Sequence, residues 1–245
     1  MAPGTPQNVQ VQPGGFHDFP IPNGLASTRY WPKFGCDASG NQCRVGESGG
    51  PGQSCHPQFG CAPPVDSKFE ATFGVAGQPC NPGAGQTAGC DWLDVSMVDG
   101  YTVPFKVDIV GDCHNHPGVD CSHLSQAQCP VNDVIAGVGV QNLRVHHPGT
   151  GAYAGCYSPC AKLTYSNWNN GLGKHLPQHP AAQHFCCPTP PVSVAQCKAG
   201  PVVRTKYVQS VHANCPGVYA YAYDDEVGLS TCQAGAHYHV TFFCP

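Results

Sequence analysis

Cysteine is the residue that most constrains how this chain can fold. The sequence of 245 residues contains 17 cysteines, together with 30 glycines and 25 prolines. Glycine and proline in such numbers favour turns and loops over long regular elements, and a chain so rich in cysteine is typically held together by disulfides. Disulfides persist in oxidising compartments. We therefore predict a loop-rich, disulfide-stapled protein that is secreted into the extracellular space.

An odd number of cysteines leaves at least one without a partner in its own chain. The odd residue is either a free, buried thiol or a cysteine whose partner is lost or lies in another molecule. Residues 1–5 have neither the basic start nor the apolar core of a secretory signal. We expect either that a signal was removed or that the beginning of the chain is missing.

Charged residues are scarce in this sequence. They make up 11% of the chain and leave a formal net charge of -4, whereas an ordinary soluble domain has about 25% charged residues. Because the chain has no excess of basic residues, nucleic acid is not an expected partner. No apolar run approaches the roughly 18 residues that span a bilayer. Each charged side chain is therefore more informative than usual.

Segments with strand character lie towards both ends of the chain, and a region dense in Cys, His, Pro and Gly lies between them. Strands are predicted at 27–31, 65–73, 105–110, 218–223 and 237–243. Short helical turns are expected within 122–131, 153–163 and 181–187. Apolar residues spaced three or four apart predict a clearer helix over 201–214. The simplest architecture is an all-β sandwich whose first and last strands meet.

This architecture divides the chain into consecutive segments, each with its own character. They are an N-terminal arm with the first sandwich strand (1–35), a small disulfide-rich lobe (36–64), the sandwich core (65–112), a disulfide-rich, partly helical lobe (113–214) and the C-terminal sandwich strands (215–245). A cleft between the larger lobe and the sandwich is the default place for a ligand.

The stretch 90–104 organises the rest of the chain. Apolar residues alternate with polar ones over 93–97, so Asp94 lies on the face of a strand opposite to the apolar side chains. Gly100 then permits a sharp bend. We expect that bend to bring Asp99 round to the side of Asp94.

Four separated motifs carry a family resemblance. They are LDVSMVDGYTVP at 93–104, the adjacent cysteines of FCC at 185–187, CP at 215–216 with YAYAYDD at 219–225, and the ending HYHVTFFCP at 237–245. Together and in this order they resemble the thaumatin-like proteins, also called the pathogenesis-related group 5 family, over residues 27–245. The resemblance implies a thaumatin-like β-sandwich with a disulfide-rich, partly helical second lobe and a small third lobe.

The resemblance also implies a set of disulfides. The implied pairs are Cys36–Cys43, Cys55–Cys61, Cys113–Cys232, Cys121–Cys215, Cys129–Cys156, Cys160–Cys186 and Cys187–Cys197. Cys80 and Cys90 have no counterpart in the family pattern, and we expect them to close an insertion.

The family resemblance leaves Cys244 unpaired. Its partner in the family lies on a first N-terminal strand, and this chain has no cysteine before Cys36. We expect the edge of the last strand to be open to another molecule. The protein is expected to be a monomer, with a disulfide-linked dimer through Cys244 as the alternative.

Family members carry an acidic cleft between lobe and sandwich, and its residues match positions in this sequence. The matches are Arg29, Glu70, Asp94, Asp99 and Asp224, with Asp225 as a substitute for Asp224. Like charges that share a site raise the pKa of at least one of them, and a protonated carboxyl can protonate a glycosidic oxygen while an ionised neighbour assists. We therefore predict Glu70 as the acid and Asp94 or Asp99 as its partner.

The remaining predicted site residues would bind rather than react. Arg29 would position a carboxylate, and the rings of Tyr101, Tyr221 and Tyr223 would face a sugar. No cofactor is implied. The leading hypothesis is an extracellular defence or cell-wall-active protein that binds, and weakly hydrolyses, β-1,3-glucan or another cell-wall polysaccharide. The alternatives are a non-enzymatic carbohydrate- or surface-binding module, and a protein-binding or structural role through the open edge near Cys244.

The 13 histidines invite a metal interpretation, because His237 and His239 would share one face of a strand. The resemblance assigns most nearby cysteines to disulfides, and no group of residues has a familiar zinc spacing. We therefore predict no metal site.

Overall fold

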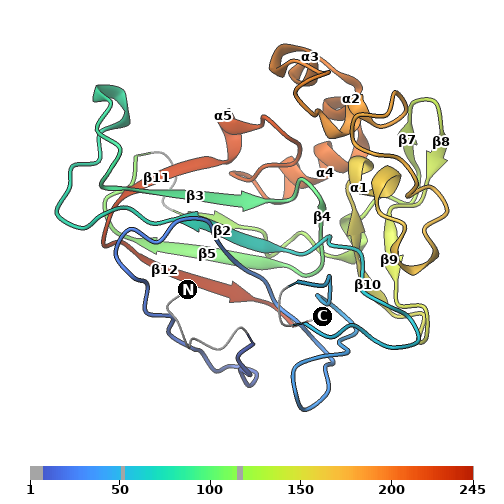
Figure 1. Cartoon of the computed structure of the whole chain (residues 1–245), viewed down its shortest axis with the longest axis horizontal. Helices are drawn as coiled ribbons and strands as arrows, with labels where there is room; N and C mark the ends of the chain where they lie inside the picture. The colour runs from blue at the N-terminus through green and yellow to red at the C-terminus, as the bar shows by residue number, and fades with distance from the viewer. Residues whose placement is uncertain (1–7, 51–52, 115–117, 245) are drawn as a thin grey trace.

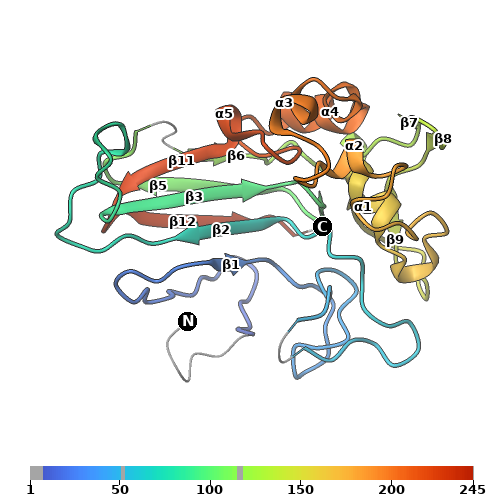
Figure 2. The same ribbon diagram turned by 45° about the horizontal axis from the view of Figure 1, so that its top comes forward.

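The computed structural model describes residues 8–50, 53–114 and 118–244, and two antiparallel sheets form its centre (Figure 1). The first sheet has the order β1-β2-β3-β11 and the second the order β12-β5-β6. The first contains β1 (Thr28–Tyr30), β2 (Lys68–Thr72), β3 (Cys90–Ser96) and β11 (Leu229–Gln233). The second contains β12 (His237–Phe242), β5 (Phe105–Val110) and β6 (Gly118–Asp120). Figure 2 shows these sheets as the layers of a sandwich.

The core between the two sheets follows from the two-residue period of the strands. In β3 and β2, Leu93, Val95 and Phe69 are buried, while the residues between them face outward. Tyr238 of β12 crosses the core, where its ring packs against Phe69 with 5.8 Å between centroids. Its hydroxyl donates to Asp91 Oδ2 at 2.6 Å. Each fully buried apolar side chain contributes about 1.5–3 kcal/mol to this packing.

A second, disulfide-rich lobe closes one end of the sandwich. Its sheets are β4-β10-β9 and β7-β8. The strands are β4 (Gly100–Tyr101), β7 (Asp133–Ile135), β8 (Gly139–Gln141), β9 (Arg144–His146) and β10 (Tyr153–Tyr157). The α-helices of the chain are α1 (Pro159–Thr164), α2 (Gln183–Cys186), α3 (Val194–Lys198), α4 (Lys206–Asn214) and α5 (Asp225–Gly228). Single 3-10 turns are η1 (Pro82–Ala84), η2 (Gln126–Gln128), η3 (Asn167–Asn169) and η4 (Pro201–Arg204).

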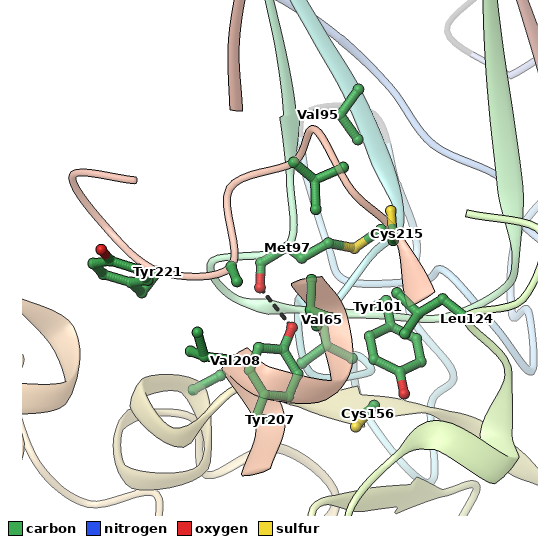
Figure 3. Packing of buried hydrophobic residues seen from close by; sticks show 14 of the residues in the cluster. Val65, Val95, Met97, Tyr101, Leu124, Cys156, Tyr207, Val208, Cys215 and Tyr221 are labelled. Atoms are coloured by element: carbon green, nitrogen blue, oxygen red, sulfur yellow. Dashed lines mark hydrogen bonds between the residues drawn. The ribbon is translucent and has the colours of Figure 1, made fainter. Parts of the chain in front are cut away.

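Tyr207 of α4 fixes this lobe to the sandwich (Figure 3). It is fully buried, and its hydroxyl donates to the carbonyl of Met97 at 2.6 Å, directly after β3. Its ring stacks on that of Tyr101 with 6.2 Å between centroids. The chain segment that leaves β3 is therefore held in place by the second lobe.

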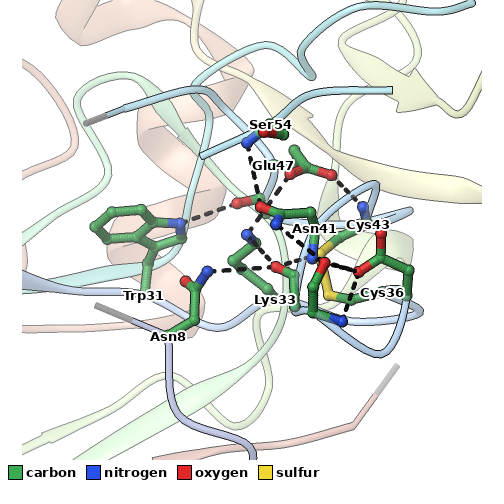
Figure 4. Close-up of a disulfide and its surroundings, with 12 residues drawn as sticks. Asn8, Trp31, Lys33, Cys36, Asn41, Cys43, Glu47 and Ser54 are labelled. Atoms are coloured by element: carbon green, nitrogen blue, oxygen red, sulfur yellow. Dashed lines mark hydrogen bonds and ion pairs between the residues drawn. A yellow bond between two sulfur atoms is a disulfide. The ribbon is translucent and has the colours of Figure 1, made fainter. Parts of the chain in front are cut away.

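The cysteines form eight disulfides, and Cys244 is free and exposed. The pairs are those that the family resemblance implied, together with Cys80–Cys90. Two of them lie in the small lobe, Cys36–Cys43 and Cys55–Cys61. Figure 4 shows the first of these. Beside it, the buried Glu47 carboxylate accepts from the Cys43 amide and pairs with Lys33 Nζ at 3.6 Å. Side-chain and backbone hydrogen bonds thus replace the apolar core that so short a segment cannot form.

The sandwich class and its disulfide-rich lobes are confirmed, but some predicted elements are wrong. Segment 218–223 is not a strand: only Tyr219 forms a bridge, with Ser96, and the chain then turns through Tyr223 at a φ of 68°. Segment 201–214 is two helices, because Thr205 is extended and its side chain caps α4. The predicted helical turn at 153–163 begins as the strand β10, and β11 was not predicted.

Candidate acidic site on the outer face of the first sheet

Three predicted site residues form a row across neighbouring strands. Arg29 of β1 is paired with Glu70 of β2, and Glu70 is paired with Asp94 of β3. Directly paired residues of antiparallel strands lie on the same face, with their Cβ atoms about 4.5–5.5 Å apart. Because Leu93 and Val95 are buried in the sandwich core, Asp94 belongs to the outer face. The row therefore lies across the outer face of the first sheet.

Arg29 and Glu70 form an ion pair within this row. Arg29 Nη2 lies 2.7 Å from Glu70 Oε1, and Arg29 Nε donates to the same oxygen at 2.9 Å. The side chain of Arg29 is 58% exposed and that of Glu70 is 21% exposed. Two contacts from one guanidinium fix the direction of the Glu70 carboxylate. The sequence analysis predicted a positioning role for Arg29, and this ion pair is the contact through which it would act.

Asp94 is the carboxyl of the row whose pKa is raised. Burial raises its pKa to about 7, the negative charges of Glu70 and Asp225 add to this, and the cations Lys68 and Arg29 oppose it. Its Oδ1 atom is buried and has no hydrogen-bond partner within the described residues. The sequence analysis predicted Glu70 as the acid and Asp94 as a partner. Among the described residues Glu70 forms an ion pair with Arg29, and Asp94 forms none.

Asp99 does not join the row. Gly100 does bend the chain, at a φ of 142°, and a Cβ atom there would collide with the Cys156 carbonyl. The bend directs Asp99 to two other partners. Lys68 Nζ lies 2.9 Å from its Oδ2, and the hydroxyl of Tyr165 donates to its Oδ1 at 3.0 Å. The cation Lys68 thus lies between the two aspartates: it pairs with Asp99 and lowers the pKa of Asp94.

Lys68 and Asp66 are site residues that the sequence analysis missed. Burial raises the pKa of Asp66 to about 6, although hydrogen bonding by Ser48 and the charge of Lys68 lower it. The signal was present in the sequence, because charged residues recur at every second position, 66, 68 and 70. That period places them on one face of an extended chain. Lys68 and Asp66 therefore add a second cation and a further carboxylate to the predicted set.

Of the two adjacent aspartates near the C-terminus, Asp225 is the one whose charge affects the pKa of Asp94. Asp224 is 4% exposed; its Oδ2 lies 2.7 Å from His212 Nε2 and accepts from the Ala220 amide. Asp225 accepts from the hydroxyl of Tyr219 at 3.0 Å and raises the pKa of Asp94. The substitute named from the sequence, Asp225, thus lies near the row, whereas Asp224 holds the turn that precedes α5.

The tyrosines predicted to face a sugar do not line this face. Tyr101 is 1% exposed and belongs to the core, so the prediction for it is wrong: β4 directs its ring towards Tyr207. Tyr221 is 9% exposed in the same core cluster. The Tyr223 hydroxyl donates to Thr189 Oγ1 at 2.8 Å. The aromatic residue that shares the face of Asp94 is Trp92, two positions earlier on β3, and the sequence analysis missed it.

The described residues contain no group of three or more His, Cys, Asp or Glu side chains arranged to hold a metal ion. Within the same residues, no helix combines the length and the apolar character needed to cross a membrane.

The thaumatin family model matches residues 2–245 of this chain, which is more than the segment 27–245 that carried the resemblance. The chain belongs to the thaumatin family. Thaumatin-like protein 2 of Prunus persica is 27% identical over 93% of this chain and 75% of its own length. A protein of Prunus avium named glucan endo-1,3-beta-glucosidase is 29% identical over 93% of this chain and 74% of its own. Pathogenesis-related protein 5 of Arabidopsis thaliana is 29% identical over 96% and 78%.

Proposed function

We propose that this thaumatin family protein is an extracellular, defence-type protein that binds β-1,3-glucan across the Arg29–Glu70–Asp94 row and hydrolyses it weakly. The observation that carries the proposal is the pair of unlike carboxyls on neighbouring strands. Asp94 has a pKa raised to about 7, and Glu70 beside it is held in an ion pair by Arg29. A carboxyl with a raised pKa beside a second, oriented carboxyl matches the pair of groups that glycoside hydrolysis uses.

The two carboxyls have different roles in this proposal. Asp94 donates its proton to the glycosidic oxygen as the bond to the anomeric carbon breaks, and Glu70 stabilises the positive charge that develops on the sugar ring. A water molecule then adds to the anomeric carbon and returns a proton to Asp94. Arg29 orients Glu70 through their ion pair. The relative from Prunus avium carries the name of such an enzyme, and eight disulfides fit an oxidising, extracellular environment.

Release of reducing ends from linear β-1,3-glucan tests the proposal. Asp94→Asn removes the proton donor, so we expect its rate to fall by about 10²–10⁴-fold, and Glu70→Gln to fall comparably. Wild-type activity declines as the pH rises through about 7, because Asp94 then loses its proton. Asp108→Asn, on the exposed part of β5, is the control and keeps the wild-type rate.

Two results would contradict hydrolysis. One is an Asp94→Asn protein with the wild-type rate. The other is a correctly folded wild type that releases no reducing ends. If that wild type still sediments with insoluble β-1,3-glucan and Asp94→Asn does so less, the protein is the non-enzymatic carbohydrate-binding module.

A second candidate function is binding of another protein at the edge of the second sheet. Within the described residues β12 pairs only with β5, and the exposed, free Cys244 follows it. An edge strand presents unpaired backbone groups to a partner strand. Gel filtration and non-reducing gels of wild type and Cys244→Ser test this. A dimer that the substitution abolishes supports it, and a wild type that stays monomeric at high concentration refutes self-association.

A further inference from the structure

A cavity of about 360 Å³ lies beside the row, between the first sheet and the insertion closed by Cys80–Cys90. Its volume is within the range of about 300–1,000 Å³ that is usual for small-molecule sites. Its lining comes from both sides: Trp92, Leu229 and Thr231 from the sheet, Asn81 and Pro82 from the insertion, and His114. The acidic residues of the row do not line it.

Strand register places this cavity next to Asp94. Trp92 is paired with Thr72 on one side and with Thr231 on the other, and Asp94 is paired with Leu229. Trp92 and Asp94 are two residues apart on β3, so they lie on one face about 7 Å apart along the strand. Leu229 lines the cavity and is also the neighbour of Asp94. The cavity and the row are therefore adjacent parts of one surface.

Hydrogen bonds fix the insertion that forms the outer wall of the cavity. Gln233 of β11 makes two side-chain hydrogen bonds to the insertion. Its Nε2 donates to the carbonyl of Gln78 at 2.8 Å, and its Oε1 accepts from the Cys80 amide at 3.2 Å. Asn81 and Gln86 exchange two backbone hydrogen bonds of 2.7 and 3.0 Å. Figure 1 shows the insertion, with its single 3-10 turn, projecting beside the ends of β3 and β11. A fixed wall lowers the ordering cost of ligand binding.

The lining is amphipathic. Among the described residues it contains no Asp, Glu, Lys or Arg, and His114 is its one titratable side chain. The indole Nε1 of Trp92 donates no hydrogen bond to any residue that the structure describes, so it is available to a ligand. The amide of Asn81 and the hydroxyl of Thr231 add polar groups around the indole. A pyranose ring has the matching character, with apolar C–H faces and a rim of hydroxyls, whereas a charged ligand would find no counter-charge.

We propose that this cavity is a saccharide subsite that takes one neutral hexopyranose unit, stacked on Trp92, of a glucan chain that continues over Asp94. The subsite deepens the proposed function and rests on it, because it supposes that the row binds the same chain. Stacking on Trp92 would then add affinity only for oligosaccharides long enough to reach from the row into the cavity.

Calorimetric titration with β-1,3-linked glucose oligomers of two to six units tests the subsite. In wild type we expect affinity to rise with length and then to level off. Trp92→Ala should lose about tenfold in affinity for the longest oligomer, since ring stacking contributes about 0.5–1.5 kcal/mol, and lose little for the dimer. Trp92→Phe keeps a ring and should retain most of the affinity. Trp168→Phe, in the second lobe, is the control for loss of an indole elsewhere.

The outcomes separate the subsite from the proposed function. If Asp94→Asn and Glu70→Gln weaken binding but folded Trp92→Ala binds every length like wild type, the subsite is refuted and the function stands. If wild type binds no β-1,3-linked oligomer, the function is refuted, and β-1,4-linked glucose and mannose oligomers are titrated next. Binding of one of these that Trp92→Ala weakens upholds a saccharide site at Trp92, and binding of none overturns it.

Discussion

Two groups of acidic side chains lie near the outer face of the first sheet, and their charges are balanced in different ways. The strand pair, Glu70 and Asp94, lies on neighbouring strands, and within the described residues the ion pair of Arg29 is with Glu70. The Lys68 group comprises Asp99, which contacts both Lys68 and Tyr165, and the buried Asp66. The comparison teaches that proximity of carboxylates alone does not make a proton donor. Burial without a cation in contact raises the pKa of a carboxyl, as it does for Asp94 and for Asp66.

The largest expected effect on stability comes from removing the cation of the Lys68 group. Lys68→Met leaves Asp99 without its ion-pair partner, and the Lys68 side chain is only 10% exposed. We expect the free energy of unfolding to fall by about 3 kcal/mol, measured by guanidinium denaturation with the disulfides intact.

The matched control is Lys106→Met. The ion pair of Lys106 with Asp108 is 2.7 Å long but lies at the surface, so its loss should change the free energy of unfolding much less than the loss of Lys68 does. If the two variants lost equal amounts of unfolding free energy, burial of the Lys68–Asp99 ion pair would have no effect on its contribution to stability.

The next substitution changes Asp94 of the strand pair, and we expect it to raise the free energy of unfolding. Because the pKa of Asp94 is raised to about 7, the folded protein holds this proton at a pH where the unfolded chain has released it. Asp94 therefore makes the folded state less stable as the pH rises from about 4 to 7. Asp94→Asn should therefore stabilise the protein at pH 8 and change its stability little at pH 4. A stability difference that does not change between these pH values would show that Asp94 is not the protonated group.

A smaller effect is expected from the hydroxyl that supports Asp99. Tyr165→Phe removes a hydrogen bond of 3.0 Å to Asp99 Oδ1 and should lower the free energy of unfolding by about 1 kcal/mol. Tyr157→Phe is the control, since its hydroxyl reaches Asn167 O only at 3.5 Å. If both substitutions cost the same, the Tyr165 hydroxyl has no special role in the Lys68 group.

The smallest effect on stability is expected at Arg29, which is 58% exposed. Arg29→Ala should change the free energy of unfolding by about 0.5 kcal/mol. Its electrostatic effect is more informative, because Arg29 lowers the pKa of Asp94 while Glu70 raises it. Carbon NMR titration should therefore show the Asp94 pKa rising in Arg29→Ala and falling in Glu70→Gln. Shifts in the same direction in the two variants would contradict the arrangement of the row.

Sequence patterns predicted the elements in which side-chain alternation is regular. Residues 105–110 form the strand that was expected, and Leu93 and Val95 are buried on the face that their alternation indicated. The pattern was misleading at 218–223, where alternating tyrosines and alanines have the period of a strand. There Tyr219 exchanges backbone hydrogen bonds with Val95 and Met97, and the chain then turns towards α5. A local period cannot show whether a partner strand is present for the following residues.

The sequence by itself determined a secreted type of composition, an odd cysteine, and a polar face on the strand that carries Asp94. These depend on counts and on the two-residue period of a strand. Only the tertiary structure decided that the pKa of Asp94 is raised, that Asp99 is paired with Lys68, and that Trp92 lines a cavity. The physical reason is that desolvation and Coulomb interactions depend on distance in space. Residues 68, 70, 94, 99 and 225 acquire those distances only when strands far apart in the chain are paired.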